Sequence, residues 1–254
     1  HGQFPGITGR ICFHPCEKEC ARNAVDGAVN INAVEQFLGD LDLPEEQPAV
    51  RHTAKIAVVG SGPASLTCAS DLAKHGYEVT IFEAFHTAGG VLVYGIPEFR
   101  LPKAIVAKEV ARLEHFGVKI MTDTVVGRTI TVDELMDEMG FEAVFIGSGA
   151  GLPMFMNIPG VNYKGVLSAN EFLTRINLMK AYLPDSDTPL IHPKKVAVVG
   201  GGNVAMDAAR CHRACDKFDR RFRAVEEAAD KPLPECGEAE LLALWNDAKS
   251  HDPS

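Results

Sequence analysis

The feature that most constrains the fold of this chain is an apolar segment, residues 55–60, that runs directly into a glycine loop. The segment reads Lys-Ile-Ala-Val-Val-Gly, a helical pattern follows it as far as residue 76, and a second apolar run occupies residues 78–83. Strand, helix and strand in this order and length predict two parallel strands joined by a crossover helix. We therefore expect an α/β fold.

The loop after the first strand reads Gly-Ser-Gly-Pro-Ala-Ser at residues 60–65. Gly60 allows the tight turn, and Gly62 lets the backbone approach a pyrophosphate. The pyrophosphate would lie at the positive N-terminus of the helix that begins with Pro63 and Ala64. The loop therefore predicts a dinucleotide site.

Two residues near this loop bear on that prediction. Ser65 occupies the position where glycine or alanine is usual, so the contact between helix and strand must accommodate one additional hydroxyl. Glu83 ends the second strand, where a carboxylate can accept hydrogen bonds from an adenosine ribose. The alternative is a tight turn in a doubly wound fold whose acid is merely solvated.

A second glycine loop, residues 200–205, reads Gly-Gly-Gly-Asn-Val-Ala and fits the same template. Gly200 and Gly202 would allow the turn and the close approach, and Asn203 and Val204 would begin the next helix. The loop is expected to bind another dinucleotide, and a plain turn is the alternative.

The sequence around the second loop predicts the elements on either side of it but not the strand that should follow. Residues 195–200 predict a buried strand, and residues 203–211 are compatible with a helix. Beyond Arg210 no apolar run resembles the next strand, which should carry the confirming acid or base. The alternative of a plain turn is therefore stronger here than at the first loop.

Two segments between the loops are glycine-rich. In residues 89–103, Gly90 could let the backbone approach a flat ring system. Arg100 and Lys103 could face phosphates or negative charge generated by a redox reaction. Residues 143–150 predict a short buried strand that enters a glycine turn at Gly149, a second contact to the first dinucleotide. Plain core is the alternative for this strand.

Three cysteines lie close together near the N-terminus, Cys12, Cys16 and Cys20. Three thiolates at this spacing can converge on an iron–sulfur cluster or, with His14, on zinc. Three reduced structural cysteines are the alternative, and His14 is then a hydrogen-bonded neighbour. Apolar residues at helical spacing predict a helix over residues 30–41, packed over the cysteines. A polar, proline-bounded linker at residues 43–48 predicts a domain boundary.

Composition excludes several classes of protein. The chain has 254 residues, 46% of them hydrophobic, so it can bury a sizeable core. Its net charge of −9 argues against nucleic acid or an anionic membrane surface as partner. Glycines and prolines interrupt the longest uncharged run, residues 143–163, so no membrane span is expected. The cysteine spacing fits a reducing, cytoplasmic setting better than a disulfide framework.

Together these motifs resemble a known family, the small subunit of NADPH-dependent glutamate synthase. The resemblance rests on the two glycine loops and on three further segments: Phe-Pro-Gly-Ile-Thr-Gly-Arg-Ile-Cys at 4–12 with the later cysteines, Tyr-Gly-Ile-Pro-Glu-Phe-Arg-Leu-Pro-Lys at 94–103, and Gly-Val-Leu-Ser-Ala-Asn-Glu-Phe-Leu-Thr at 165–174. The large subunit of the electron-bifurcating NADH-dependent ferredoxin:NADP oxidoreductase and the N-terminal part of dihydropyrimidine dehydrogenase are similar to the same segments. The resemblance covers residues 4–210.

The resemblance implies FAD on the first loop, NADP(H) on the second and two 4Fe-4S clusters in an N-terminal helical domain. Cys12 and Cys16 would bind one cluster, Cys20 would serve the other, and Glu35 matches an unusual fourth ligand. The implied FAD contacts are Gly60, Gly62, Pro63, Ala64, Glu83, Gly90, Arg100 and Gly149. The implied NADP(H) contacts are Gly200, Gly202, Asn203 and Val204.

The chain departs from the family pattern at both ends. The first four-cysteine motif is missing upstream, and beyond Arg210 neither the second cofactor strand nor the flavin-closing segment is recognisable. The chain also begins at His1 rather than at a methionine. We therefore expect a fragment, or a tail that diverges through a change of reading frame.

The expected fold is α/β, with two Rossmann-like dinucleotide-binding domains, for FAD and NAD(P), the second incomplete, behind a small α-helical iron–sulfur domain. The expected domains are residues 1–48, 49–165 and 166–254. The expected function is an oxidoreductase subunit that passes electrons between NAD(P)H, FAD, iron–sulfur clusters and a partner subunit. That partner would be a glutamate synthase large subunit or an electron-transfer flavoprotein subunit. The alternatives are a non-catalytic dinucleotide-binding or electron-relay module and a dinucleotide-binding domain with a zinc site.

Overall fold

The structure, a computed structural model, describes residues 2–41, 51–183, 185–191, 193 and 195–251. The chain divides into two units, His1–Val161 and Asn162–Ser254. The predicted linker at 43–48 lies outside the described residues, so the division into three domains stays a prediction. No helix in the described ranges is both long and apolar enough to cross a membrane.

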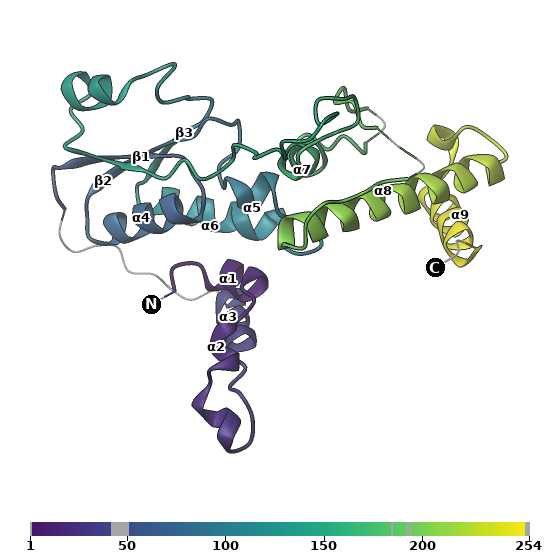
Figure 1. Cartoon of the computed structure of the whole chain (residues 1–254), viewed down its shortest axis with the longest axis horizontal. Coiled ribbons are helices and arrows are strands. Elements are labelled where there is room, and N and C mark those ends of the chain that lie inside the picture. The colour runs from purple at the N-terminus through teal and green to yellow at the C-terminus, as the bar shows by residue number, and fades with distance from the viewer. Residues whose placement is uncertain (1, 42–50, 184, 192, 194, 252–254) are drawn as a thin grey trace. The chain divides into compact units, whose positions relative to one another are not determined.

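The first unit combines an N-terminal group of short helices with an α/β sheet (Figure 1). Its described elements, in chain order, are α1 (Pro5–Ile11), α2 (Pro15–Lys18), η1 (Ala21–Ala24), α3 (Ile31–Asp40), β1 (Lys55–Val59), α4 (Pro63–Lys74), β2 (Glu78–Phe82), α5 (Val91–Tyr94), α6 (Lys103–His115), β3 (Lys119–Met121), η2 (Glu134–Glu138) and β4 (Ala143–Ile146). The predicted succession of strand, helix and strand is confirmed as β1, α4 and β2.

The sheet is parallel throughout and has the strand order β3-β2-β1-β4. In β1, Val58 pairs with Ile81 of β2 on one side and with Phe145 of β4 on the other. This register brings the carboxyl ends of β1 and β4 to the same edge of the sheet. In open parallel sheets, ligands bind at that edge.

The sheet buries both of its faces at the central strands. Ala57 packs with Phe82, Leu135 and Phe141 in one apolar cluster. The next residue along β1, Val58, points to the opposite face because side chains alternate along a strand, and it is fully buried too. Helix α4 contacts both β1 and β2, and α4 and α6 lie on the same side of the sheet (Figure 1).

The edge strand β4 differs from its prediction. The strand at residues 143–150 is confirmed, but it is not buried: Phe145 is 37% exposed and Ile146 is 66% exposed. The reason is its position at the end of the strand order, where the described residues give it a neighbour on one side only. Apolar composition predicted the strand correctly and its burial wrongly.

The N-terminal helices α1 and α3 pack backbone against backbone. A Cβ atom at Gly39 would lie 1.9 Å from the backbone nitrogen of Gly6, and one at Gly9 would lie 2.5 Å from the backbone nitrogen of Gln36. No larger residue fits either position without moving a helix. At the end of α3, Arg10 contacts Asp40 at 2.8 Å and holds the pKa of that carboxyl below its usual value.

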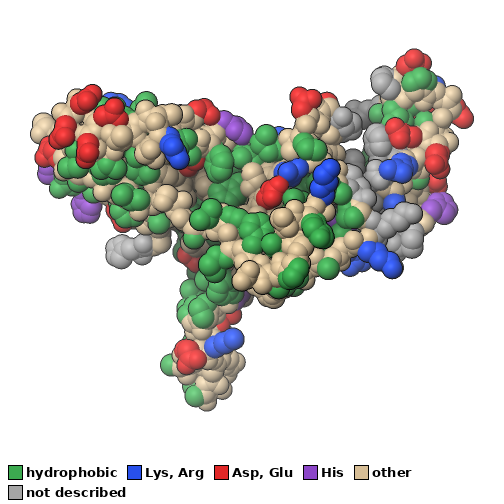
Figure 2. Space-filling model, turned by 45° about the horizontal axis from the view of Figure 1, so that its top comes forward, with side chains coloured by type: hydrophobic (Ala, Val, Ile, Leu, Met, Phe, Trp, Pro, Cys, Tyr) green, Lys and Arg blue, Asp and Glu red, His purple; other side chains and the backbone are tan. Residues whose placement is uncertain are grey.

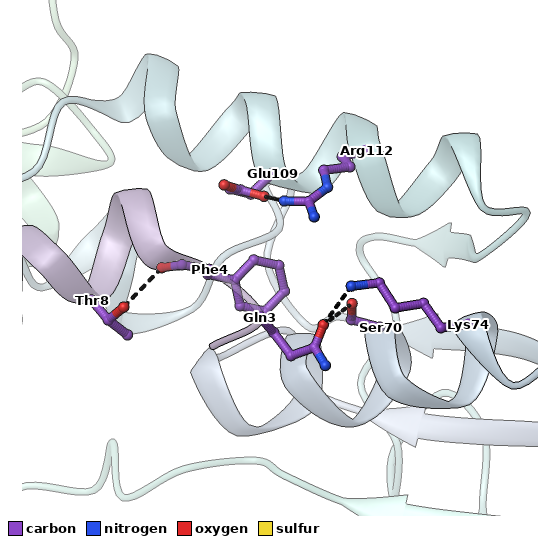
Figure 3. Close-up of polar contacts among 7 residues, drawn as sticks. All are labelled: Gln3, Phe4, Thr8, Ser70, Lys74, Glu109 and Arg112. Carbon is purple, nitrogen blue, oxygen red and sulfur yellow. Dashed lines mark hydrogen bonds and ion pairs between the residues drawn. The ribbon is translucent and has the colours of Figure 1, made fainter. Parts of the chain in front are cut away.

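The N-terminal segment contacts α4 through Gln3 (Figure 3). The side-chain oxygen of Gln3 accepts hydrogen bonds from the Ser70 hydroxyl at 3.0 Å and from the Lys74 ammonium at 2.7 Å. Phe4 is buried, and burial of a phenylalanine contributes roughly 1.5–3 kcal/mol. The Gln3 contacts fix the start of the cysteine-bearing segment against α4.

Helix α3 confirms the predicted helix over residues 30–41, and Asn30 caps it by accepting the Ala33 N–H at 3.2 Å. The expected burial of its apolar face is wrong. The five apolar residues that predicted the helix are between 43% and 64% exposed: Val29, Ile31, Val34, Phe37 and Leu38. Hydrophobic side chains are visible on the surface of the molecule (Figure 2). The glycine contact with α1 uses a different part of the helix, so this face is left outside.

The second unit is helical in its described residues. Its elements are α7 (Ala169–Asn177), α8 (Asn203–Ala228), η3 (Leu233–Glu235) and α9 (Glu238–His251). The Ser168 hydroxyl caps α7 by accepting the Glu171 N–H at 3.1 Å. An apolar cluster of Leu173, Ile176, Ala208 and Cys211 joins α7 to α8.

The strand predicted at residues 195–200 is wrong. This segment has no regular secondary structure, and Val196, Val198 and Val199 are 46%, 39% and 73% exposed. A parallel strand needs neighbours for its backbone N–H and C=O groups, and the described residues of the second unit contain no strand. The helix predicted from residue 203 is confirmed as α8, which continues well beyond the predicted end at residue 211.

Candidate functional site

The first glycine loop begins at the end of β1. Gly60 has φ +88°, and a Cβ atom there would lie 2.7 Å from the carbonyl oxygen of Gly147. Its N–H continues the sheet by donating to the Phe82 carbonyl at 2.7 Å. Only glycine meets both demands, because other residues rarely adopt this φ and none could avoid the carbonyl.

Gly62 is the N-cap of α4 and has extended backbone angles. Pro63 follows at the first helical position, where its fixed φ suits a helix and its missing N–H is not needed. The first turn carries no side-chain cap and no acidic residue, and nothing lies within 4 Å of where a Cβ of Gly62 would be. The N–H groups of this turn, Ala64 included, are therefore available to an anion.

Glu83 is buried at the end of β2 and is bonded to the loop itself. Its Oε2 accepts the Ser61 N–H at 2.9 Å and the Ser61 hydroxyl, and its Oε1 accepts the Phe85 N–H at 2.8 Å. The Ser61 oxygen in turn accepts the Gly89 N–H at 2.8 Å. The glycine loop and the segment from Glu83 to Gly89 thus share one buried polar network.

Gly90 lies directly against the loop. It has φ +54°, and a Cβ atom there would be 2.8 Å from the Cα of Gly62. Its backbone therefore packs directly on the loop at Gly62. The predicted close approach by Gly90 is made to the loop backbone, and a contact to a ring system stays a prediction.

Arg100 and Lys103 differ from each other in this structure. Arg100 lies half-buried in the turn between α5 and α6, and its contact with a phosphate stays a prediction. Lys103 points inward, and its ammonium donates to the carbonyls of Leu92 at 2.9 Å, Leu101 at 3.1 Å and Ile96. The expectation that Lys103 faces a phosphate is therefore wrong, because these carbonyls hold it inside the segment.

The turn after β4 reaches the first loop. The Ser65 hydroxyl donates to the Gly147 carbonyl at 3.2 Å, which is how the packing absorbs the unusual hydroxyl of the loop. A Cβ atom at Gly147 would lie 2.1 Å from that hydroxyl oxygen. Gly149 has φ +71° and open space around it. The turn is thus beside the loop, as predicted, and its contact with a dinucleotide stays a prediction.

Two aromatic rings lie beside Glu83. Phe85 and Tyr94 meet edge to face, with ring centroids 5.6 Å apart. Burial raises the pKa of the Tyr94 phenol, and the negative charge of Glu83 adds to the effect. Tyr94 therefore stays a neutral hydrogen-bonding group at physiological pH.

The second loop keeps the helix start and lacks the strand. Gly200 has φ +127°, and Gly202 is the N-cap of α8 with extended backbone angles. Helix α8 has no side-chain cap, no acidic residue in its first turn and open space at Gly202, and the first turn includes Asn203 and the half-exposed Val204. The loop presents N–H groups to an anion, but among the described residues its backbone has no neighbouring strand to hold it.

The cysteine segment does not assemble a ligand set in this structure. Cys12 and Cys16 are exposed, and Cys20 is half-buried. No three His, Cys, Asp or Glu side chains of the described ranges lie close enough to hold a metal ion. Glu35, the expected fourth ligand, accepts the Thr8 hydroxyl at 2.6 Å. The residues present therefore do not fit a cluster as they stand.

His14 is a hydrogen-bonded neighbour of the cysteine segment, as expected, but through its backbone. The ring Nδ1 is buried without a hydrogen-bond partner among the described residues. Its backbone has φ +43°, and its N–H approaches the Cys12 sulfur at 3.4 Å. The contact between His14 and Cys12 is thus through backbone rather than through the ring.

Comparison with known proteins agrees with this geometry. The pyridine nucleotide-disulphide oxidoreductase family matches residues 54–248. The chain belongs to this family. The matched range includes both glycine loops and extends past Arg210, where the expected resemblance ended.

Curated relatives of this chain support the glutamate synthase resemblance. The NADP(+)-dependent formate dehydrogenase subunit beta of Moorella thermoacetica is 38% identical over 233 residues, 81% of this chain and 32% of that protein. The NADPH-Fe(3+) oxidoreductase subunit beta of Geobacter sulfurreducens is 38% identical over 216 residues, 82% and 31% of the two chains. The glutamate synthase (NADPH) small chain of Bacillus subtilis is 38% identical over 213 residues, 80% and 42%. The chain thus spans less than half the length of each.

Two parts of the candidate site at the first loop were not predicted from the sequence. The sequence pattern assigned no role to Ser61, which bonds Glu83 and Gly89, and none to Gly147, which meets Gly60 and Ser65. The signal for Ser61 was a hydroxyl directly after the first loop glycine. The signal for Gly147 was the second glycine turn, whose register beside β1 only the sheet order reveals.

Proposed function

We propose that this chain is the dinucleotide-binding part of an electron-transfer oxidoreductase subunit and that it binds FAD at the first loop. The observation that supports the proposal best is the open, uncapped first turn of α4, next to a buried carboxylate on the neighbouring strand. A diphosphate and a ribose joined to it need these two features at this spacing.

The residues at the first loop fit FAD in their chemistry. The N–H groups after Gly60 and Gly62, including those of Ala64, would bind the pyrophosphate, with Pro63 fixing the start of the helix. Glu83 would accept a ribose hydroxyl. The remainder of the FAD site is proposed to be lined by Gly90, Arg100 and Gly149. Bound FAD supplies a carrier that takes up an electron pair and releases electrons one at a time.

Titration of the purified chain with FAD tests this site. We expect saturable quenching of flavin fluorescence at one FAD per chain. Gly62→Asp places a carboxylate in the open space over the loop and should weaken binding at least tenfold through repulsion of the pyrophosphate. Gly237→Asp adds the same charge at an open glycine of the second unit and serves as the control. Unchanged FAD affinity in Gly62→Asp would contradict the proposed site.

The second loop is proposed to bind NADP(H) through Gly200, Gly202, Asn203 and Val204. The uncapped start of α8 supports an anion there, and the names of the three relatives support NADP over NAD. With NADPH as electron donor, the anaerobic chain loaded with FAD should lose its flavin absorption. Gly202→Asp should slow this bleaching without changing FAD affinity.

Iron–sulfur ligation by Cys12, Cys16, Cys20 and Glu35 stays a prediction that rests on the family resemblance. Because the ligands do not converge in this structure, no electron-transfer step is assigned to a cluster. Iron and acid-labile sulfide analysis of anaerobically purified chain tests ligation. Zinc without iron or sulfide would favour the zinc alternative, and no metal would favour reduced structural cysteines.

In the whole protein the subunit is proposed to deliver electrons to a partner subunit in a cytoplasmic complex. The relatives carry names with different electron acceptors, so a glutamate synthase large subunit and an electron-transfer flavoprotein subunit are both compatible. Isolation of the native complex identifies the partner. The competing function is a non-catalytic dinucleotide-binding or electron-relay module, which FAD binding without bleaching by NADPH would favour.

A further inference from the structure

Ser61 concentrates two hydrogen bonds on one oxygen of Glu83. Its backbone N–H lies 2.9 Å from Oε2, and its hydroxyl donates to the same oxygen. Both residues are buried: Ser61 is 1% exposed and Glu83 is 5% exposed. A buried carboxylate oxygen with two donors of this kind is held in one orientation.

The remaining acceptor positions of the carboxylate can be counted. A carboxylate offers about two positions on each oxygen. Ser61 occupies both positions of Oε2, and the Phe85 N–H occupies one position of Oε1 at 2.8 Å. One position, on Oε1, is left for a ligand hydroxyl among the described contacts.

The Ser61 hydroxyl also connects the Glu83 carboxylate to the turn at Gly89. Its oxygen accepts the Gly89 N–H at 2.8 Å, and the next residue, Gly90, stands against Gly62. Without the hydroxyl, Oε2 would gain a free acceptor position, and a buried N–H would lose its partner. Serine at this position therefore sets both the direction of Glu83 and the position of the Gly89 turn.

We infer that Ser61 is a positioning residue of the first dinucleotide site, which presents Glu83 to the adenosine ribose through Oε1 alone. The site would then read one ribose hydroxyl through a single hydrogen bond and would be insensitive to the other. The inference rests on the proposed function, since it assigns the recognition of FAD in more detail. It makes Ser61 the residue that determines selectivity at the ribose.

Three ligands test the inference on the full chain: FAD and its analogues that lack either the 2′- or the 3′-hydroxyl of the adenosine ribose. The unsubstituted chain should bind one analogue about tenfold more weakly than FAD, because one hydrogen bond to a charged group is lost. It should bind the other analogue within about twofold of FAD. In Ser61→Ala the two analogues should bind alike, because Oε2 is then open to the second hydroxyl.

Two further variants separate positioning from a structural effect. Ser61→Thr keeps the hydroxyl and should restore the difference between the analogues. Ser70→Ala removes another buried hydroxyl of α4, which donates to Gln3 rather than to the site. This variant should keep the difference in affinity between the two analogues unchanged. Circular dichroism of each chain without ligand verifies that the variants are folded.

Each result has one interpretation. If the unsubstituted chain bound both analogues more weakly than FAD by the same factor, recognition of the ribose through Oε1 alone would be overturned. If Ser61→Ala lowered the affinity of all three ligands by one factor, the positioning role would be overturned in favour of a structural one. If the unsubstituted chain bound no FAD, the proposed function would fail, and this inference with it.

Discussion

The two glycine loops follow nearly the same residues, and only the first follows a strand. Lys-Ile-Ala-Val-Val-Gly at 55–60 and Lys-Val-Ala-Val-Val-Gly at 195–200 differ by one methylene group. Val58 is fully buried between strands of the first unit, whereas its counterpart Val198 is 39% exposed in the second. The helix after each loop begins with the same glycine N-cap and without a side-chain cap.

The difference shows that the helix start is specified locally and the strand is not. A glycine N-cap needs only the residues around it, but a strand needs hydrogen-bond partners on neighbouring strands. The first unit supplies β2 and β4 as neighbours of β1. Each residue of the first loop has a counterpart 140 positions later in the second loop. Matched substitutions at such pairs can therefore measure the difference between the loops.

The largest difference is expected between Val58→Asp and Val198→Asp. A carboxylate at Val58 would be buried without a partner, which should cost about 4 kcal/mol or more. The same change at the exposed Val198 should stay within about 0.5 kcal/mol. Urea denaturation followed by circular dichroism measures both. Equal losses would mean that residues 195–200 form a buried strand after all.

A smaller difference is expected between Gly60→Ala and Gly200→Ala. Both glycines have positive φ, which costs alanine about 1–2 kcal/mol. At Gly60 the added Cβ also meets the Gly147 carbonyl at 2.7 Å, whereas at Gly200 the nearest atom is the Ala205 Cβ at 3.4 Å. Gly60→Ala should therefore destabilise by about 2–4 kcal/mol in total. Denaturation of both variants measures these losses, and fluorescence of the single tryptophan, Trp245 of α9, follows the unfolding of the second unit separately. A larger loss at Gly200 would contradict the open geometry of the second loop.

The third loop position should give a difference of about 0.5 kcal/mol between the two loops. Ser65→Ala removes the hydrogen bond to the Gly147 carbonyl, and one buried hydrogen bond contributes about 1 kcal/mol. The reverse exchange, Ala205→Ser, should cost about 0.5 kcal/mol, because a helical serine can donate to the carbonyl four residues earlier. Thermal unfolding of both variants checks this. A stabilised Ser65→Ala would show that the hydroxyl does not join α4 to the turn after β4.

The smallest effect is expected at the N-caps, where the two loops should behave alike. Serine is a slightly better N-cap than glycine, by a few tenths of a kcal/mol. Gly62 and Gly202 both have negative φ and open space, so Gly62→Ser and Gly202→Ser should each stabilise the chain without ligand by about 0.3 kcal/mol. Destabilisation of one variant alone would show that its loop is closed by a neighbour.

The sequence predicted those parts of the fold that depend on local pattern. The strands β1 and β2, the helix α4 between them and the start of α8 all follow from apolar runs and glycine positions. Burial was less predictable because it depends on neighbours. The apolar face of α3, the strand β4 and residues 195–200 are all exposed, and each lacks a covering element among the described residues.

The candidate site was predicted as a set of positions but not as a network. Gly60, Gly62 and Glu83 follow from the spacing of the motif. The bonds that join them pass through Ser61 and Gly89, to which the motif assigns no role. Lys103 shows the opposite error, since a lysine near a glycine turn suggested a phosphate, but three carbonyls bind it.

The contact between Ser65 and Gly147 has a consequence for how this family can vary. The hydroxyl lies where a side chain at residue 147 would begin, at 2.1 Å. The two positions therefore share one volume, and an evolutionary change at one constrains the other. A Cβ atom at residue 147 would also lie 2.9 Å from the Phe145 ring, so this position is crowded by two side chains. A residue larger than glycine at position 147 should therefore occur among homologues only together with changes at Phe145 and at Ser65, which is 82 positions away in the chain.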